Sequence, residues 1–382
     1  MKILVVTNIP TPYRIAFFNV LNNKLKEVSG ELKVLYCANN EPDRHWEIDL
    51  KEQDFEYKIL NGQHLNIKGL YLHFNYDILK ETKSFHPDYI LYAGSWNMPT
   101  VMFSVLFNKF FKKPYKKIFW SEGHDGSILF KKGFVPRIRK YIQNKFDVFA
   151  VPNSRSEKYL FERLNLDIKP IVILPNTVDG AFFSKPESWT TSDSNKIKEH
   201  FNIPIESKLI IQVSQIEDRK GIEELVSFWN KLKNNQKENY QLVIVGEGSL
   251  KGKMIQKCKD ENIRNVHFVG NQKKEQVRDL LFSSDIFILL TKNDPNPLTL
   301  IEASFAKLPI ITTKFAGNCN EIVAKKNGVI INDITFEEFE NAFVFAKEIS
   351  SNGNGLHSFE NASRFFDIEL VAVNLINQLS KI

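Results

Sequence analysis

Short apolar runs alternate along the chain with segments in which apolar residues recur every three or four positions. Continuous apolar runs of about four to eight residues are typical of strands buried on both faces of a parallel sheet. The second pattern is typical of amphipathic helices. The alternation therefore predicts an α/β protein built from doubly wound sheets with helices on both faces.

The elements fall into two series. The first predicts strands at residues 3–7, 32–37, 57–60, 89–93, 117–121, 148–151 and 171–174, and helices at 14–25, 98–111 and 156–164. The second predicts strands at 209–214, 241–245, 266–269, 286–290, 310–313 and 329–331, and helices at 221–232, 250–262, 274–283 and 298–306. A capping box from Ser154 to Glu157 marks the start of one helix.

A polar stretch at 184–194 lacks any periodic apolar pattern and separates the two series. We therefore predict a first Rossmann-like domain at 1–183, a linker at 184–195 and a second Rossmann-like domain at 196–364. A last helix, 368–379, lies in a terminal segment at 365–382.

Composition agrees with this organisation. A chain of 382 residues with 43% hydrophobic and 25% charged residues is long enough for two domains with substantial cores. The three cysteines, Cys37, Cys258 and Cys319, lie far apart, which favours a reducing compartment. The first apolar run stops at Pro10 and is too short for a signal peptide, and no segment approaches the roughly 20 apolar residues of a membrane span. We expect a cytoplasmic protein.

The net charge of the chain excludes few functions by itself. A net charge of +6 is modest for this length, and no zinc-finger, helix-turn-helix or RNA-recognition pattern is present, so we discount nucleic acid as a partner. Phenylalanines and lysines interleave at 103–117, and 131–145 adds basic residues. This stretch has two interpretations: a surface that rests on anionic lipid at the inner face of a membrane, or a buried aromatic helix face followed by a solvated lysine-rich loop.

The segment 285–321 predicts an anion site. A buried strand ends in a loop that contains Pro295 and Pro297, and a helix begins at Leu298. Free amides near Leu298 and Thr299 would point at a ligand, and the helix dipole favours a negative group such as a diphosphate. Two acids frame the site, with Asp294 in the loop, Glu302 on the helix and seven residues between them.

This spacing resembles the Glu-x7-Glu signature of retaining, GT-B-fold glycosyltransferases of the family 4 type, in the bacterial surface-glycan subset. Asp294 stands where that family usually has Glu. The resemblance implies two Rossmann-like domains with a cleft between them, and terminal helices that cross back onto the first domain. It also implies that the acid at the Asp294 position meets donor sugar hydroxyls and that Glu302 meets the ribose.

The segment VSQIEDRKGIEEL is similar to the place where the family sets an Arg and, five residues later, a Lys on the donor diphosphate. Lys220 stands at the Lys position and Gln215 at the Arg position. Arg219 is a candidate replacement, although adjacent side chains normally point in different directions. The alternative for Lys220 is a solvated lysine at a helix start. Gly246 opens a Gly-x-Gly loop that resembles the family's but is common after strands, and it gives no support for a nicotinamide cofactor.

The strand at 117–121 runs into the sequence Glu-Gly-His-Asp-Gly. The family often has a His at this strand end, facing the donor sugar, and His124 is our match, with Glu122 as the rival alignment. The alternative is a surface histidine, but the carboxyl end of a strand is where ligands bind in open α/β sheets.

No Asp-x-Asp and no His, Cys and carboxylate cluster occurs at metal spacing, so we predict no cofactor and no metal. Lys220 and the helix beginning near Leu298 would then stabilise the departing nucleoside diphosphate. His124, Lys220 and Asp294 form the predicted catalytic set. The resemblance implies retention of configuration without an enzymatic nucleophile.

The resulting hypothesis is a transferase that moves a hexose or N-acetylhexosamine from a nucleoside diphosphate sugar to a saccharide or polyprenyl-linked glycan acceptor in bacterial polysaccharide assembly. Two alternatives stay open. One is a GT-B-fold sugar-nucleotide epimerase. The other is a degenerate sugar-nucleotide-binding partner subunit, suggested by Gln215 and Asp294 at two family positions.

Overall fold

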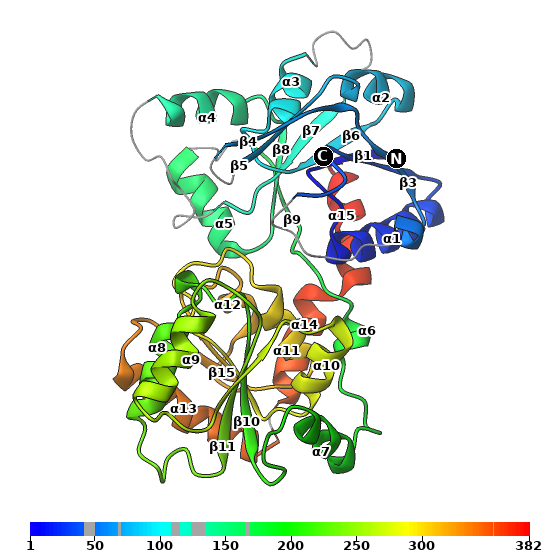
Figure 1. Ribbon diagram of the computed structural model, residues 1–382. Helices are drawn as coiled ribbons and strands as arrows, with labels where there is room; N and C mark the ends of the chain where they lie inside the picture. The colour runs from blue at the N-terminus through cyan, green and yellow to red at the C-terminus, as the bar shows by residue number, and fades with distance from the viewer. Residues whose placement is uncertain (42–49, 68–69, 108–114, 124–133, 165–168, 354) are drawn as a thin grey trace. The chain divides into compact units, whose positions relative to one another are not determined.

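The computed structural model describes residues 1–41, 50–67, 70–107, 115–123, 134–164, 169–353 and 355–382. The chain forms two compact units (Figure 1). The first comprises Met1–Val178 together with Ile368–Ile382, and the second comprises Asp179–Asp367.

Within the described residues, the first unit contains a seven-stranded parallel sheet in the order β3-β2-β1-β6-β7-β8-β9. Its strands are β1 (Lys2–Thr7), β2 (Glu31–Tyr36), β3 (Glu56–Ile59), β6 (Tyr89–Ala93), β7 (Lys116–Trp120), β8 (Val148–Val151) and β9 (Ile171–Ile173). The strands β4 (Gly62–Ile67) and β5 (Leu70–Asn75) form a separate antiparallel hairpin.

Alternate residues of β1 face two cores. Ile3 and Val5 face a core that also contains residues of α1 (Pro12–Glu27) and α15 (Ile368–Leu379). Leu4 and Val6 face the other core, which contains residues of α2 (Ile78–Phe85), α3 (Pro99–Phe107), α4 (Val135–Gln143) and α5 (Ser154–Tyr159). In Figure 1 the red α15 lies beside the blue α1, so the end of the chain completes the core of the first unit. Short 3-10 and π-helical segments add Leu50–Glu52 and Leu160–Leu164.

The second unit contains a six-stranded parallel sheet in the order β12-β11-β10-β13-β14-β15 within the described residues. Its strands are β10 (Lys208–Val213), β11 (Tyr240–Val245), β12 (Val266–Gly270), β13 (Ile286–Leu289), β14 (Ile310–Thr313) and β15 (Gly328–Ile331). The helices α8 (Ile222–Lys231), α9 (Lys251–Asp260) and α13 (Phe336–Ser351) share one core with this sheet.

The other face of this sheet contacts α10 (Lys274–Phe282) and α11 (Leu298–Phe305). The remaining helical segments of the second unit are α6 (Gly180–Phe183), α7 (Thr191–His200), η4 (Asp218–Lys220), α12 (Cys319–Ile322) and α14 (Leu356–Phe366).

The predicted α/β fold class with two doubly wound sheets is confirmed, and every predicted strand is present. The hairpin β4-β5 was not predicted. The N-cap of α5 is Asn153, one residue before the predicted cap Ser154. The Asn153 side chain accepts the hydrogen bond from the Ser156 backbone N–H at 2.9 Å.

The structure differs from the sequence-based prediction at the linker expected at 184–195. The two units meet in sequence at Val178 and Asp179, and the polar stretch lies inside the second unit. Its end begins α7, because Thr190 and Asp193 form a reciprocal capping box. A polar helix without an apolar stripe gives no periodic signal, which is why the sequence alone gave no helix there.

Among the described residues, the helices are all too short or too polar to cross a bilayer.

Candidate functional site

The second unit has a topological switch point between β10 and β13. From β10 the chain builds outward through β11 and β12, whereas β13, β14 and β15 extend the sheet on the other side. Loops that follow β10 and β13 therefore diverge at the carboxyl edge of the sheet, which is where open parallel sheets bind ligands. Lys220 follows β10 and Asp294 follows β13.

The loop after β10 turns at a glycine. Gly221 has φ of +68°, and a Cβ there would lie 1.9 Å from the Leu290 carbonyl oxygen, so a larger residue would not fit. The backbone is also tied to the loop after β13, since the Arg219 carbonyl accepts hydrogen bonds from Lys292 N (2.8 Å) and Thr291 Oγ1 (2.9 Å). The turn holds Lys220 against the second loop.

The loop after β13 is fixed by its other neighbour. Asp294 N donates to the Phe315 carbonyl at 3.2 Å, and Gly317 N donates to the Asp294 carbonyl at 2.8 Å. These bonds form an isolated parallel bridge between Asp294 and Ala316. The backbone N–H of Asn296 donates to Asp294 Oδ1 at 3.3 Å. Backbone bonds thus hold the Asp294 carboxylate in place.

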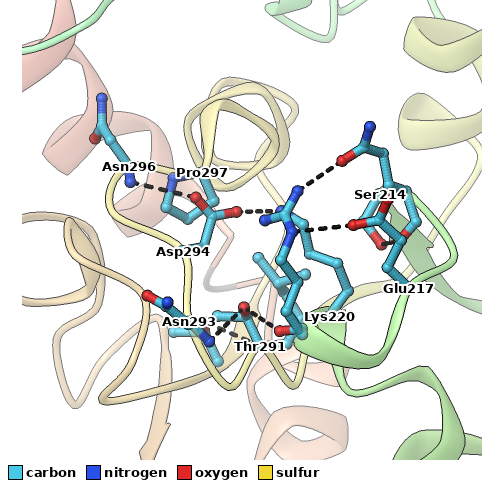
Figure 2. Close-up of polar contacts among 12 residues, drawn as sticks. Ser214, Glu217, Lys220, Thr291, Asn293, Asp294, Asn296 and Pro297 are labelled. Carbon is cyan, nitrogen blue, oxygen red and sulfur yellow. Dashed lines mark hydrogen bonds and ion pairs between the residues drawn. The ribbon is translucent and has the colours of Figure 1, made fainter. Parts of the chain in front are cut away.

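Lys220 and Asp294 form an ion pair between Nζ and Oδ2 (Figure 2). Both residues are buried, with 9% and 7% of their surfaces exposed. The resemblance implied that Lys220 holds a diphosphate and that Asp294 holds sugar hydroxyls, but here each is the partner of the other. A buried pair of this kind resists loss of one member, because the remaining charge would be buried alone.

The helix α11 begins beside this pair with unsatisfied donors. Its N-cap, Pro297, provides no side-chain cap, and within the described residues no hydrogen bond is recorded to the N–H groups of Leu298 and Thr299. Asn318 Nδ2 donates to the Pro297 carbonyl at 3.1 Å and so fixes the turn. The helix start therefore presents two backbone donors and the positive end of the helix dipole.

Asn296 is the site residue that the sequence did not single out. It is 7% exposed, yet neither Oδ1 nor Nδ2 has a hydrogen-bond partner among the residues that the structure describes. Buried carboxamides normally have partners, so this one marks a place where another molecule can supply them. An asparagine between two prolines reads as a turn residue in the sequence, which is why it gave no functional signal.

Glu302 lies on the second turn of α11 and is half-buried. Burial raises the pKa of its carboxyl to about 7, and the nearby Lys274 ammonium opposes this only in part. Among the described residues, no hydrogen bond to its side chain offsets this burial. A strongly perturbed carboxyl without a partner, next to a helix start, is typical of a binding or catalytic site.

Arg219 and Lys220 point in different directions. Lys220 reaches into the sheet edge, whereas the exposed Arg219 lies over its own loop. Its NH2 group donates to Gln215 Oε1 at 2.6 Å and its Nε to Glu217 Oε2 at 3.0 Å. The Arg219 guanidinium therefore lies at the side chain of Gln215, the position where the resembling family has its arginine.

Gly246 has a structural reason to be glycine. Its φ is +134°, and a Cβ would lie 2.0 Å from the Ser214 carbonyl oxygen, so the loop after β11 packs closely on the loop after β10. Its N–H donates to the Gly270 carbonyl at 2.8 Å. This close approach shapes the site even though Gly246 brings no side chain.

Two predicted site residues, Glu122 and His124, belong to the first unit. His124 lies outside the described residues. Glu122 follows β7, and its Oε1 accepts from Arg14 NH2 at 3.3 Å and from Asn176 Nδ2 at 2.9 Å. Burial alone would lower the pKa of Arg14, but Tyr13 and Glu122 outweigh it and raise the pKa above its usual value. Glu122 is thus engaged with a permanently charged arginine that the sequence gave no reason to select.

Among the described residues, no group of three or more His, Cys, Asp or Glu side chains is placed to hold a metal ion.

Comparison with protein families supports a glycosyltransferase-like site in the second unit. Residues 193–357 match the family of glycosyl transferases group 1. An uncharacterized glycosyltransferase of Methanocaldococcus jannaschii, MJ1059, is 25% identical over 255 residues, which cover 65% of this chain and 61% of the relative. The N-acetyl-alpha-D-glucosaminyl L-malate synthase of Bacillus anthracis is 27% identical over 182 residues, which cover 47% of this chain and 44% of the relative. The chain thus spans less than two thirds of the length of these curated relatives.

Solved structures support the fold of the whole chain. HepE of Anabaena in complex with UDP has a TM-score of 0.77 at 13% identity, covering 100% of both chains. The same protein with UDP-glucose has a TM-score of 0.73 at 14% identity, again covering 100% of both chains. The predicted GT-B fold class is therefore confirmed.

The ion pair predicts a specific pattern of stabilities. Lys220→Gln or Asp294→Asn alone should lower the free energy of unfolding by about 3–5 kcal/mol, because each leaves a buried charge without its partner. The double variant should lose less than the sum of the two single losses. Urea denaturation followed by circular dichroism measures all three.

An exposed pair provides the control. Lys253 and Glu223 lie 3.0 Å apart with side-chain exposures of 61% and 39%. Lys253→Gln should cost at most about 1 kcal/mol. Lys220→Gln and Lys253→Gln losses of equal size would contradict the buried pair.

Glu302 predicts a pH-dependent effect on stability. Its pKa in the folded protein, about 7, lies above the ordinary value of 4.5, so ionisation costs stability progressively as the pH rises between these values. Glu302→Gln should therefore be more stable than the wild type by about 1–3 kcal/mol at pH 8.5, and this gain should vanish towards pH 4.5. Thermal or urea unfolding at both pH values is the measurement.

Glu337, exposed at the start of α13, offers the matched substitution. Glu337→Gln should show no such gain at pH 8.5. A pH-independent effect of Glu302→Gln would mean that the carboxyl is not desolvated.

Proposed function

We propose that the protein is a glycosyltransferase that uses a nucleoside diphosphate sugar as donor, because residues 193–357 match the family of glycosyl transferases group 1. The observation that carries this proposal is the convergence at one sheet edge of the α11 amides, a cation and an unpartnered carboxyl. A nucleoside diphosphate sugar matches these groups with its phosphates and its ribose hydroxyls.

In this proposal the helix start holds the diphosphate. The N–H groups of Leu298 and Thr299 donate to phosphate oxygens, and the Asn296 carboxamide supplies a further donor. Glu302 accepts hydrogen bonds from the ribose hydroxyls. This contact favours its ionised form and offsets the desolvation that raises its pKa.

Two cations share the remaining negative charge. The Lys220 ammonium is already paired with the Asp294 carboxylate, so only part of its positive charge is available to a diphosphate. Arg219 lies on the same turn, exposed, with Glu217 and Gln215 orienting its guanidinium. We assign Arg219 as the main cation for the diphosphate, in place of the arginine that Gln215 replaces.

Transfer breaks the bond between the anomeric carbon and the β-phosphate oxygen and forms a bond from that carbon to an acceptor hydroxyl oxygen. The acceptor proton passes to the departing phosphate oxygen. The helix dipole, Arg219 and Lys220 stabilise the charge that develops on this leaving group. Retention of configuration and the absence of a metal and of an enzymatic nucleophile are part of the proposal, and they rest on the family resemblance.

The donor sugar is proposed to be a hexose or an N-acetylhexosamine. The Bacillus anthracis relative is named for an N-acetylglucosaminyl product, and Anabaena HepE binds UDP-glucose. The acceptor is proposed to be a saccharide or polyprenyl-linked glycan of bacterial polysaccharide assembly, reached by a cytoplasmic enzyme at the inner face of the membrane. His124, as the residue facing the donor sugar, stays part of the proposal.

The proposal is tested with labelled sugar nucleotides, first by thermal shift and then by release of nucleoside diphosphate with saccharide acceptors. A donor at 100 times its dissociation constant should stabilise the protein by about 2.7 kcal/mol. Tight donor binding without release for any acceptor would favour the partner-subunit alternative. Interconversion of sugar nucleotides without transfer would favour the epimerase.

Arg219 provides the sharpest variant. Arg219→Gln should weaken binding of UDP-glucose about 10- to 100-fold, since charge-assisted hydrogen bonds to phosphate contribute about 1.5–3 kcal/mol. The exposed Arg264, which precedes β12 at the opposite edge of the sheet, is the control. Isothermal titration should give wild-type affinity for Arg264→Gln, and equal losses in both variants would remove Arg219 from the site.

A further inference from the structure

The first unit contains a cavity of about 600 Å³ that the proposed donor site does not use. It lies where β1, β6 and β7 end, with Thr7, Ala93 and Trp120 in its wall. The chain builds from β1 towards β2 and β3 and then crosses to β6 on the other side, so β1 and β6 form the switch point of this sheet. A cavity in this position is suited to bind a ligand.

Most charged side chains of the cavity already have partners. Arg14 is bound by Glu122, by Thr7 Oγ1 at 2.6 Å and by the Ala93 carbonyl at 2.6 Å. Glu41, which is buried, accepts from His73 Nε2 at 3.2 Å. The two carboxylates and one of the two guanidiniums are thus engaged within the protein.

Arg139 is the exception. It lies on α4 and lines the cavity, and its guanidinium stacks over the Trp96 ring at 5.4 Å from the centroid. Its Nε is buried without a hydrogen-bond partner, and within the described residues no ion pair to this guanidinium is recorded. A half-buried cation without a carboxylate is costly to keep unless a ligand supplies the anion.

Neutral polar atoms surround this cation. Gln143 lies one helical turn further along α4, so it projects from the same helix face as Arg139. Gln143 is 4% exposed and Thr11 is 7% exposed, and both line the cavity. In the described part of the chain, neither Gln143 Oε1 nor Thr11 Oγ1 has a hydrogen-bond partner. These atoms offer hydrogen bonds to hydroxyl groups.

The walls are aromatic. Trp96 and Trp120 line the cavity, and Arg14 stacks over Trp120 at 5.0 Å from its centroid. Indole rings provide flat apolar surfaces for the C–H face of a sugar ring, while the unpartnered polar atoms meet its hydroxyls. A planar guanidinium fork matches the two oxygens of a carboxylate or the oxygens of a phosphate.

We propose that this cavity binds a saccharide through an anionic substituent, a carboxylate or a phosphate, which pairs with Arg139. The saccharide hydroxyls bond to Gln143 and Thr11. This assignment rests on the proposed function only in taking the bound saccharide as the acceptor of transfer. A neutral sugar would cover the Arg139 charge without replacing its lost hydration, so the charge makes the cavity selective.

Three probes that share a glucose-type ring test the proposal: methyl β-glucuronide, glucose 6-phosphate and methyl β-glucoside. Isothermal titration of the full chain should show at least one charged probe binding about tenfold or more tightly than the glucoside. Preference for the glucuronide identifies a carboxylate, and preference for the phosphate identifies a phosphorylated saccharide. Equal affinities for all three probes would overturn the proposal.

Variants on one helix locate the interaction. Arg139→Gln should abolish the preference for the charged probe, and Arg139→Lys should retain part of it because the charge stays while the fork is lost. Arg137, exposed on the same helix, gives the matched control, and Arg137→Gln should keep the full preference. A preference that survives in Arg139→Gln would contradict the assignment, and circular dichroism confirms that each variant is folded.

UDP-glucose binding is measured in the same samples. It should be unchanged in Arg139→Gln, since the proposed donor residues belong to the second unit. Selective probe binding without donor binding would support the saccharide site and refute the proposed function. Donor binding without selectivity among the probes would refute the saccharide site alone.

Discussion

The site of the second unit depends on one buried ion pair. Lys220 and Asp294 are 74 positions apart in the chain and belong to the loops that follow β10 and β13, on the two sides of the switch point. Their contact joins these loops together with the hydrogen bonds that Lys292 N and Thr291 Oγ1 donate to the Arg219 carbonyl. Because both groups are buried, each makes the burial of the other tolerable, and the loop that leads into α11 is fixed as a result.

Several groups next to this pair lack the partners that folding normally provides. Among the described residues, the Asn296 carboxamide has no hydrogen-bond partner and no side chain caps the first amides of α11. Burial raises the pKa of the Glu302 carboxyl to about 7. Each of these features costs free energy in the unliganded protein. Their presence at one sheet edge indicates a surface that is completed by a polar ligand. In the first unit, Arg139 Nε and Gln143 Oε1 are likewise buried without hydrogen-bond partners among the described residues, and both residues line the cavity at the carboxyl edge of that sheet.

The strands could be predicted because buried parallel strands give continuous apolar runs. The hairpin β4-β5 could not, since its residues mix polar and apolar types without a continuous run. Asp294, Glu302 and the helix start at Leu298 could be predicted because they share one short segment. Contacts between segments that are distant in the sequence could not be predicted. The pairing of Lys220 with Asp294 requires the left-handed turn at Gly221, and the reach of Arg219 to Gln215 requires the loop to fold back on itself.

The central claim is that the switch point of the second unit binds the diphosphate of a sugar nucleotide. A crystal structure of the protein with UDP tests it most directly. The account predicts phosphate oxygens within hydrogen-bonding distance of the Leu298 and Thr299 N–H groups, and ribose hydroxyls at the Glu302 carboxylate. A nucleotide bound in the cavity of the first unit, with the α11 amides left unoccupied, would contradict it.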